Sequence, residues 1–352
     1  MLKDKRVVVT GGTGSLGKVL VRRILTGELG KPMSITVFSR DEAKQHQMRL
    51  SYLRKAAATD EVIYHNFEQI LRFQIGDVRD YHAVNALLCD ADIVFNAAAL
   101  KQVPTCEYFP YEAVQTNIIG PQNIVRSIRE NNLPVEAVIG ASTDKACKPV
   151  CVMGMTKAIQ ERIFVQANMD CGDTRYVCVR YGNVLASRGS VIPLFHSQIR
   201  NGGPVTITTQ DMTRFLLSLD KAVDTIFAAA KEARRGEIYI PQVPSARIVD
   251  IAEVLIEGRP LKIIVTGIRP GEKIHEILVS EEEVNRTVDR GNYFAIKPVL
   301  PELRSVTQKE KTIDAEYSSS NNIINKTKLR KLLNEHKLLV RDEDEFEEDL
   351  VV

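Results

Sequence analysis

The sequence predicts an α/β fold in which a doubly wound parallel sheet is followed by a smaller C-terminal domain. Three observations support this prediction. Short β-branched apolar runs alternate with helix-length segments, a glycine-rich turn joins the first run to the first helix, and the alternation stops after about Tyr181. Near-continuous apolar runs are typical of strands buried on both faces, and their alternation with helices indicates right-handed crossovers between parallel strands.

The predicted strands follow one another along the first domain. The run RVVVT leads into a helix from about Ser15 to Thr26, and the run SITVFS leads into a second helix near Asp41. Four further runs, each separated from the next by a helix-length stretch, are LRFQIGD, ADIVFNAA, VEAVIGAS and RYVCVRY. Their β-branched content and spacing predict strands rather than helices.

Proline and glycine residues divide the second half of the chain into shorter, irregular segments. We therefore expect a first domain at 1–185, which has the size of a dinucleotide-binding domain, and a smaller domain at 186–330. Parts of 219–258 are expected to return to the first domain. The segment 331–352 combines a basic run with an acidic one and is expected to form a charged C-terminal tail.

The composition excludes several classes of protein. The chain has 352 residues, and its 47 Lys and Arg nearly balance its 45 Asp and Glu, so it has no global basic field for nucleic acid or anionic membranes. No window approaches the roughly 20 apolar residues of a membrane span, which leads us to expect a cytoplasmic protein. Its six cysteines lack paired spacing, so reduced thiols and no metal site are expected.

The glycine-rich turn is the first candidate site. Because it lies between a strand and a helix, its G-x-x-G-x-x-G pattern predicts a Rossmann-type domain in which backbone N–H groups and the helix N-terminus meet a dinucleotide pyrophosphate. The residues of this turn expected to contact the cofactor are Gly11, Thr13, Gly14, Ser15, Leu16 and Gly17.

The end of the second strand favours NADP over NAD. Domains that prefer NAD present an acidic residue there, whereas Ser39 and Arg40, with Lys44 one turn into the next helix, suit a 2′-phosphate. The adjacent Asp41 is expected to cap that helix, although its carboxylate leaves the NAD alternative open. Asp77 and Val78 are also expected to contact the cofactor, at its adenine. The small side chains of Ala97, Ala98 and Ala99 are expected to let the cofactor lie close to the protein backbone.

Successive motifs narrow the interpretation to one family. They are SRDEAKQ, GDVRD, NAAALKQVP, STDKA, RYGNVLASRGSVIPLF and IRPGEKIHEILVSEEE. In this order they resemble the extended short-chain dehydrogenase/reductases, and among them the UDP-N-acetylglucosamine 4,6-dehydratase/5-epimerases of capsule, O-antigen and N-acetyl-L-fucosamine biosynthesis. The resemblance spans nearly the whole chain. It implies a lyase with 5-epimerase activity that makes UDP-2-acetamido-2,6-dideoxy-β-L-arabino-hex-4-ulose and keeps a tightly bound, recycled NADP.

One position departs from the usual pattern of short-chain dehydrogenases. Where most carry Tyr-x-x-x-Lys, this chain has Met153 followed by Lys157. Methionine cannot transfer a proton. The resemblance implies that Lys157 still holds the nicotinamide ribose, and that a methionine here belongs to the branch that inverts carbon 5. Which group takes the proton of the carbon-4 hydroxyl is left open.

The resemblance also implies a mechanism. Hydride leaves carbon 4 of the sugar for NADP⁺, the ketone makes the carbon-5 proton acidic, water is lost from carbon 6, hydride returns there, and a proton reaches the opposite face of carbon 5. Lys145 is the candidate base, if burial and the nicotinamide charge lower its pKa from about 10.4 towards neutrality. Protonated Asp144 would assist the loss of water, and Thr143 and Ser142 are candidate donors to the carbon-4 oxyanion.

The substrate side needs cations and hydrogen-bonding groups for a UDP-sugar. Lys101 and Gln102 resemble a loop over the sugar, and Tyr181 to Asn183 are expected to border the nicotinamide, with Asn183 also at the phosphates. Arg180 is a further cation of this region. The diphosphate and uridine candidates are Arg188, Arg214, Arg269 and Glu272.

Two other functions compete with this one. A UDP-N-acetylhexosamine 4-epimerase would rotate a 4-keto intermediate without losing water, and a non-catalytic NADP-sensing regulator would need no diphosphate arginines. The family resemblance also suggests a homo-oligomer, with UDP-N-acetylglucosamine as the partner molecule and no nucleic-acid or membrane partner.

Overall fold

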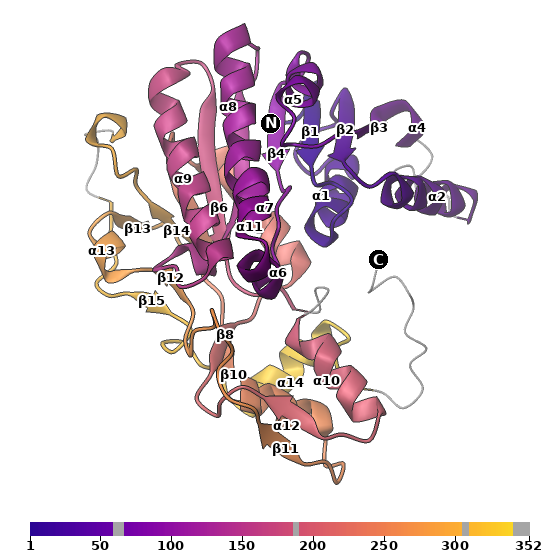
Figure 1. Cartoon of the computed structure of the whole chain (residues 1–352), viewed down its shortest axis with the longest axis vertical. Helices are drawn as coiled ribbons and strands as arrows, with labels where there is room; N and C mark the ends of the chain where they lie inside the picture. The colour runs from indigo at the N-terminus through magenta and orange to yellow at the C-terminus, as the bar shows by residue number, and fades with distance from the viewer. Residues whose placement is uncertain (59–66, 186–189, 305–309, 341–352) are drawn as a thin grey trace.

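The computed structural model describes residues 1–58, 67–185, 190–304 and 310–340. Within these residues, nine strands form one sheet in the order β13-β14-β9-β6-β5-β4-β1-β2-β3 (Figure 1). The seven strands from β9 to β3 run parallel, whereas β14 and β13 are antiparallel additions at one edge. The order from β6 to β3 is that of the Rossmann fold, which confirms the predicted doubly wound sheet.

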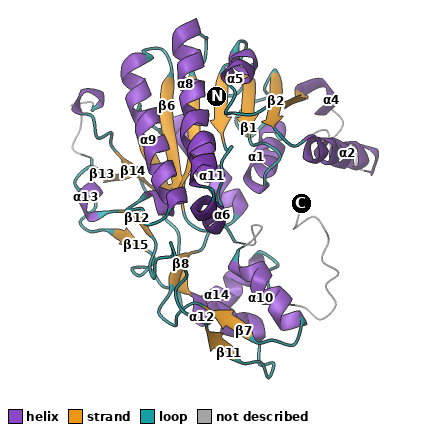
Figure 2. Cartoon of the chain, in the orientation of Figure 1, coloured by secondary structure: helices purple, strands orange, loops and turns teal. Residues whose placement is uncertain are grey.

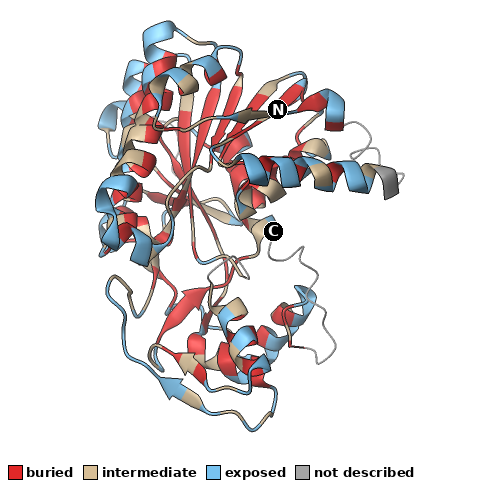
Figure 3. Cartoon of the chain, turned by 45° about the vertical axis from the view of Figure 1, so that its right-hand side comes forward, coloured by how far each residue is buried: buried red, intermediate tan, exposed pale blue. Residues whose placement is uncertain are grey.

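The strands of the main sheet correspond closely to the predicted apolar runs. Their bounds are β1 Arg6–Thr10, β2 Ser34–Ser39, β3 Leu71–Ile75, β4 Ile93–Asn96, β5 Ala137–Thr143, β6 Arg175–Tyr181, β9 Ile238–Pro241, β13 Thr287–Asp289 and β14 Tyr293–Ile296. The side chains of β4 are all buried and those of β1 nearly so, as expected for central strands covered on both faces (Figure 3).

Helices cover both faces of the sheet (Figure 2). On one face, α1 (Ser15–Leu25), α2 (Glu42–Ala58) and α11 (Leu219–Glu232) pack into one apolar core. On the other, α5 (Tyr81–Leu88), α8 (Gly120–Asn131) and α9 (Val152–Asp170) pack into a second. Shorter helical segments are α4 Phe67–Ile70, α6 Val103–Tyr108, α7 Pro110–Val114, a π-helical turn Gln115–Ile119, 3₁₀ turns Asp144–Ala146 and Pro301–Leu303, and α13 Glu281–Val284.

A smaller unit lies below the carboxyl edge of the sheet (Figure 1). Its elements are α10 Val191–Arg200, β7 Val205–Ile207, β8 Thr213–Phe215, β10 Ser245–Arg247, α12 Ile248–Ile256, β11 Ile263–Val265 and α14 Lys326–Glu335. β7 pairs with β11 and β8 with β10, and a third apolar core joins the helices. β12 (Ile277–Val279) and β15 (Tyr317–Ser318) form a separate antiparallel pair between the two units.

The chain crosses between the two units several times. After α10 and β8 it returns to the main sheet as α11 and β9, and it returns again as β13 and β14. The boundary expected at residue 331 falls inside α14, where Leu329 and Leu333 are fully buried in the smaller core, while 341–352 lie outside the described residues. Among the described helices, none is long and apolar enough to span a membrane.

Candidate active site

The predicted site residues gather at the carboxyl edge of the parallel strands. Thr10, Asn96 and Gly140 occupy adjacent register positions on β1, β4 and β5, and Thr143 pairs with Tyr181 at the end of β6. The glycine turn, the small-residue run after β4 and the Asp144–Lys145 turn after β5 therefore open at one edge. In doubly wound sheets, ligands bind outside this edge, near the point where the strand order reverses.

The glycine turn has the shape that a dinucleotide pyrophosphate requires. Gly11 has a φ of +66°, and an added Cβ would lie 2.7 Å from the backbone nitrogen of Ala98. A Cβ on Gly17 would lie 2.5 Å from the carbonyl oxygen of Gly11, so α1 packs directly against the turn. Gly14 precedes the first turn of α1, and no side chain caps this helix. The N–H groups of its first turn are therefore available to bind an anion.

The adenosine end offers cations that are engaged in local ion pairs. Arg40 lies 3.5 Å from Asp77, and Lys44 lies 2.6 Å from Asp41, whose Oδ1 also accepts the backbone N–H of Lys44 at 3.0 Å. That bond confirms the expected capping role of Asp41. Ser39 accepts a bond from the buried Gln45 amide at 3.1 Å, which leaves its own hydroxyl hydrogen to donate. The Arg40 side chain is half-exposed, so its guanidinium remains accessible beside the ion pair.

Three ionisable side chains meet after β5. The amine of Lys145 lies 3.2 Å from Asp144 Oδ1 and 3.1 Å from Glu276 Oε1, and it donates to Asn183 Oδ1 at 3.4 Å. Thr143 donates to Asp144 Oδ1 at 2.8 Å and accepts the backbone N–H of Lys145, so it fixes the turn. The carboxylates of Asp144 and Glu276 are each only 1% exposed. Sequence reasoning placed Asp144, Lys145 and Asn183 at one edge but missed Glu276.

The expected pKa of Lys145 is wrong for this state of the protein. Burial alone would lower it, but the charges of Asp144 and Glu276 outweigh burial, so the pKa of Lys145 is raised above its ordinary value. Burial raises the pKa of Asp144, and the charge of Glu276 adds to that rise. Burial also opposes ionisation of Glu276, yet Lys145 and Arg214 together hold its pKa below the usual range. Lys145 is therefore an ammonium group at neutral pH.

Glu276 is held from the second half of the chain. Its backbone N–H donates to the hydroxyl of Ser319 at 2.9 Å, and its carbonyl accepts the N–H of Ser319 at 2.8 Å. Arg214 Nε lies 3.8 Å from Glu276 Oε1. The same guanidinium donates to the carbonyls of Thr213, Ile274 and Lys273 at 2.7–3.1 Å. Arg214 was expected at the diphosphate, but it is buried and these bonds give it a supporting position beside Glu276.

Two residues expected at the substrate, Ser142 and Arg180, instead bind buried glutamates in the protein interior. Ser142 is buried and donates to Glu161 Oε1 at 2.5 Å, so the expectation that it donates to an oxyanion is wrong. Arg180 is buried between Glu161 at 2.7 Å and Glu283 at 2.8 Å, so the expectation that it meets the substrate is wrong as well. This buried network ties α9 and β6 to the segment that carries Glu276. Single-sequence reasoning had no means of pairing residues so far apart along the chain.

Lys157 and Met153 lie on α9 as the spacing requires. Lys157 is buried and donates to the carbonyl of Ala141 and to Gln160 Oε1, each at 2.7 Å, and burial lowers its pKa to about 8. Met153 is 5% exposed and packs with Cys106, Ala113 and Cys151 in a small apolar cluster. The position that holds the tyrosine of other short-chain dehydrogenases is thus filled by apolar packing.

The remaining substrate candidates lie around the same opening. A Cβ on Gly271 would lie 3.0 Å from Cys151 and 3.1 Å from Val103, so the loop with Arg269 and Glu272 packs over the starts of α6 and α9. Arg269 is exposed, and Glu272 accepts a long bond of 3.5 Å from Thr208. Lys101 and Gln102 are exposed just before α6. Arg188 lies outside the described residues. Tyr181 ends β6 opposite Thr143, and Asn183 follows two residues later.

The six cysteines carry free thiols. Cys147 and Cys151, which flank the site, are buried, and burial raises the pKa of both, that of Cys147 to about 12. Buried thiols with raised pKa values are poor nucleophiles. Within the part of the chain that the structure describes, no group of histidine, cysteine and carboxylate side chains is arranged to hold a metal ion.

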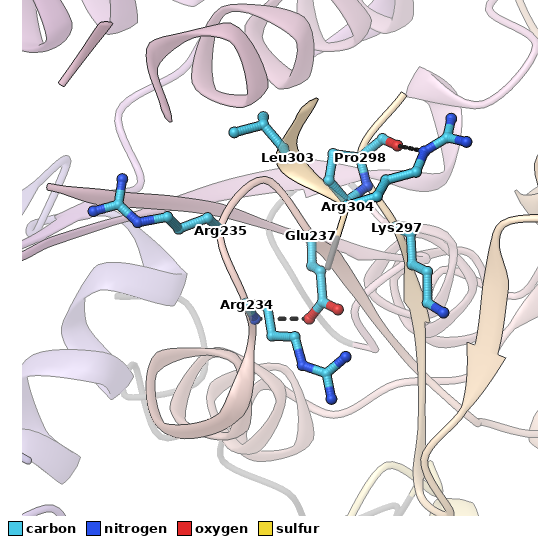
Figure 4. Close-up of a pocket in the computed structure, with 7 residues that line it drawn as sticks. All are labelled: Arg234, Arg235, Glu237, Lys297, Pro298, Leu303 and Arg304. Carbon is cyan, nitrogen blue, oxygen red and sulfur yellow. Dashed lines mark hydrogen bonds between the residues drawn. The ribbon is translucent and has the colours of Figure 1, made fainter. Parts of the chain in front are cut away.

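A cavity of about 230 Å³ lies away from this edge (Figure 4). It opens where β9 begins and β14 ends, at the opposite end of these strands from the site. Its lining residues are Arg234, Arg235, Glu237, Lys297, Pro298, Leu303 and Arg304. Arg234 and Lys297 both pair with Glu310, and the Arg235 and Arg304 guanidiniums point away from each other and donate to backbone carbonyls. Its charges are thus satisfied internally.

Several known proteins are similar to this chain in sequence or in structure. A family model described as "Polysaccharide biosynthesis protein" matches residues 7–298. A "UDP-glucose 4-epimerase" of Rickettsia bellii is 43% identical over 301 residues, 84% of each chain. A Methanocaldococcus jannaschii protein named as an uncharacterized membrane protein is 40% identical over 344 residues, 95% of this chain and 96% of its own. The X-ray structure of Pen from Bacillus thuringiensis has a TM-score of 0.84 at 35% identity, covering 96% of this chain and all of that one.

Proposed function

The chain belongs to the Polysaccharide biosynthesis protein family of extended short-chain dehydrogenase/reductases, and from this premise we propose that it is a UDP-N-acetylglucosamine 4,6-dehydratase that inverts carbon 5. At the coarser level it is a nucleotide-sugar dehydratase or epimerase. The observation that carries the finer proposal is the Asp144–Lys145 pair at the carboxyl edge, in which Asp144 is buried and the Lys145 side chain is 19% exposed, next to a helix that has Met153 in place of a tyrosine.

The Asp144–Lys145 pair supports dehydration because it can supply an acid and a base together. Their Nζ and Oδ1 atoms are 3.2 Å apart, so a hydrogen bond joins the two groups and couples their protonation. With Asp144 in its acid form, loss of one proton from the Lys145 ammonium leaves a neutral amine, which can take the carbon-5 proton, beside a carboxylic acid, which can protonate the departing carbon-6 hydroxyl. The raised pKa of Asp144 favours its acid form.

The cofactor in this proposal is a tightly bound NADP. The glycine turn fits its pyrophosphate, and Ser39, Arg40 and Lys44 fit its 2′-phosphate. When bound, the dinucleotide would supply reversible hydride transfer between its nicotinamide and carbons 4 and 6 of the sugar. Lys157 would hold the ribose through its remaining N–H, and Asp77 and Val78 would line the adenine. Ala97 to Ala99 would let the cofactor lie close to the backbone, and Tyr181 and Asn183 would border the nicotinamide.

On the substrate side, we propose that UDP-N-acetylglucosamine lies between the sheet edge and the smaller unit. Lys101, Asn183, Arg188, Arg269 and Glu272 are its candidate contacts. The family description supports a role in polysaccharide assembly such as capsule or lipopolysaccharide. We further propose a cytoplasmic homo-oligomer.

A second candidate function is favoured by a relative's name. The Rickettsia bellii protein, 43% identical, is called a UDP-glucose 4-epimerase. An epimerase needs no acid for the loss of water, and so it would give the buried Asp144 no part in the reaction.

The product of purified protein with UDP-N-acetylglucosamine, without added cofactor, separates these functions. Mass spectrometry that shows the loss of one water supports the dehydratase. An unchanged mass with altered stereochemistry at carbon 4 establishes the epimerase, and an unchanged substrate with bound dinucleotide would contradict both functions for this sugar and favour a non-catalytic role.

Substitution of Lys145 tests the assignment of the base. Because the amine takes the carbon-5 proton, Lys145→Ala is expected to lower kcat at least about 100-fold while the bound dinucleotide is retained. Turnover and the dinucleotide released on denaturation are measured in the same preparations. The control is Lys148→Ala, which removes a lysine paired with Glu281 and Glu316 and should keep wild-type turnover. Equal turnover in the two variants would rule out Lys145 as the base.

A further inference from the structure

We propose that Glu276 is a positioning residue that decides where protons lie on the Asp144–Lys145 pair: it stays an anion beside Arg214 and so keeps both of its neighbours protonated. This inference rests on the proposed function, because it assigns a role within the same site. It adds a residue from the second half of the chain, more than 130 positions away from the pair in the sequence.

The geometry makes Glu276 and Asp144 competitors for one ammonium group. Lys145 Nζ lies 3.1 Å from Glu276 Oε1 and 3.2 Å from Asp144 Oδ1. Both carboxyl groups are 1% exposed, so water cannot screen their repulsion. Among the described residues, Asp144 Oδ2 and Glu276 Oε2 are buried without a hydrogen-bond partner. The charge of one ammonium group cannot offset the cost of burying two carboxylates, so protonation of one carboxylate is favoured.

Arg214 determines which carboxyl group stays charged. Its Nε lies 3.8 Å from Glu276 Oε1, and the carbonyls of Thr213, Ile274 and Lys273 hold its guanidinium in place. Glu276 thus has two cations within 4 Å, whereas Asp144 has Lys145 and the neutral hydroxyl of Thr143. The proton therefore goes to Asp144, which is the group that must donate one when water leaves.

The other groups around Asp144, Lys145 and Glu276 do not change which carboxyl group is protonated. The amine of Lys273 donates to the carbonyl of Cys147 at 2.6 Å and adds positive charge near Glu276. His275 Nδ1 is bonded to the hydroxyl of Thr213 at 2.8 Å. Asn183 is neutral, and burial raises the pKa of the Cys151 thiol, so it stays uncharged. The cations gather on the Glu276 side.

The substitution Glu276→Gln removes the charge and keeps the shape. The anchors of this residue to Ser319 are main-chain bonds, so the substitution leaves them in place. Loss of the anion removes repulsion from Asp144 and attraction from Lys145. Both groups should then release their protons at lower pH, by about one unit each for a charge at this range.

The experiment is a carboxyl ¹³C NMR titration of the full chain labelled at the side-chain carboxyl of aspartate, with Asp144→Asn to assign the resonance. In the wild type, Asp144 is expected to titrate above the ordinary aspartate range, and in Glu276→Gln its midpoint should fall by about one unit. Glu276→Asp, which keeps the charge, should retain most of the elevation. Glu281→Gln, an exposed glutamate of α13, should leave the midpoint unchanged.

The outcomes separate this inference from the proposed function. An Asp144 midpoint that is equal in the wild type and in Glu276→Gln overturns the inference, even if the wild type dehydrates UDP-N-acetylglucosamine. A lowered midpoint supports the role of Glu276 even if that sugar is not dehydrated, because the titration needs no substrate. With a substrate that turns over, the pH profile of kcat should also shift to lower pH in Glu276→Gln, whereas a merely structural defect would lower kcat without moving the profile.

Discussion

The side chain of Lys145 illustrates how neighbours decide the chemistry of a single residue. Burial alone would favour a neutral amine, the form that the sequence led us to expect. Two carboxylates within 3.2 Å reverse that preference and hold the ammonium form. The sequence places Asp144 beside Lys145 but cannot show that Glu276 faces them from the other half of the chain. The position of the pair was therefore predictable, and its charge state was not.

Arg40 is the residue on which the choice between NADP and NAD depends. Because a charge-assisted hydrogen bond to the 2′-phosphate would be lost, Arg40→Ala is expected to weaken NADP binding about tenfold and to leave NAD binding nearly unchanged. Affinities of the dinucleotide-free protein for the two cofactors provide the measurement. Arg49→Ala, which removes an exposed arginine from α2, the helix that follows Arg40, is the control. Parallel losses for both dinucleotides would argue against contact with the 2′-phosphate.

At the scale of elements, local patterns predicted the parallel strands and the helices between them. The predicted helix from Ser15 to Thr26 is α1, and the one near Asp41 is α2. Both were predictable because their signals are local: amphipathic spacing in α1 and the capping residue Asp41 before α2. The strands β13 and β14 were not predicted. They are short and join the sheet edge from a distant part of the chain, and a three- or four-residue run carries little periodicity.

The contact between α1 and the glycine turn gives a prediction at this scale. A Cβ on Gly17 would lie 2.5 Å from the backbone of Gly11 and Gly12, so Gly17→Ala must push the helix away from the turn. We expect a loss of about 1–3 kcal/mol in stability and at least tenfold weaker dinucleotide binding. Urea unfolding and dinucleotide titration measure the two effects. Gly172→Ala, at an exposed position with no described atom within 4 Å of the new Cβ, should change neither. If both variants behave alike, close packing at the turn is not what dinucleotide binding requires.

At the scale of the whole molecule, the site is assembled from both halves of the chain. The main sheet supplies Asp144 and Lys145 on one turn, while Arg214 and Glu276 come from segments on either side of the return through α11 and β9. The buried bonds of Arg180 to Glu161 and Glu283 link the same regions. Sequence motifs indicated the sheet and the glycine turn. They could not indicate these long-range pairs, because their geometry depends on the crossings between the two units.

The central claim is that the assembled site removes water from UDP-N-acetylglucosamine and inverts carbon 5. The most direct test is proton NMR of the nucleotide sugar after incubation with the purified protein in D₂O, without added cofactor. The account predicts a 4-keto-6-deoxy sugar with one deuterium at carbon 5 and the inverted configuration there. A dehydrated product with the original configuration at carbon 5 would contradict the inversion, and a product that keeps its carbon-6 hydroxyl would contradict the dehydration.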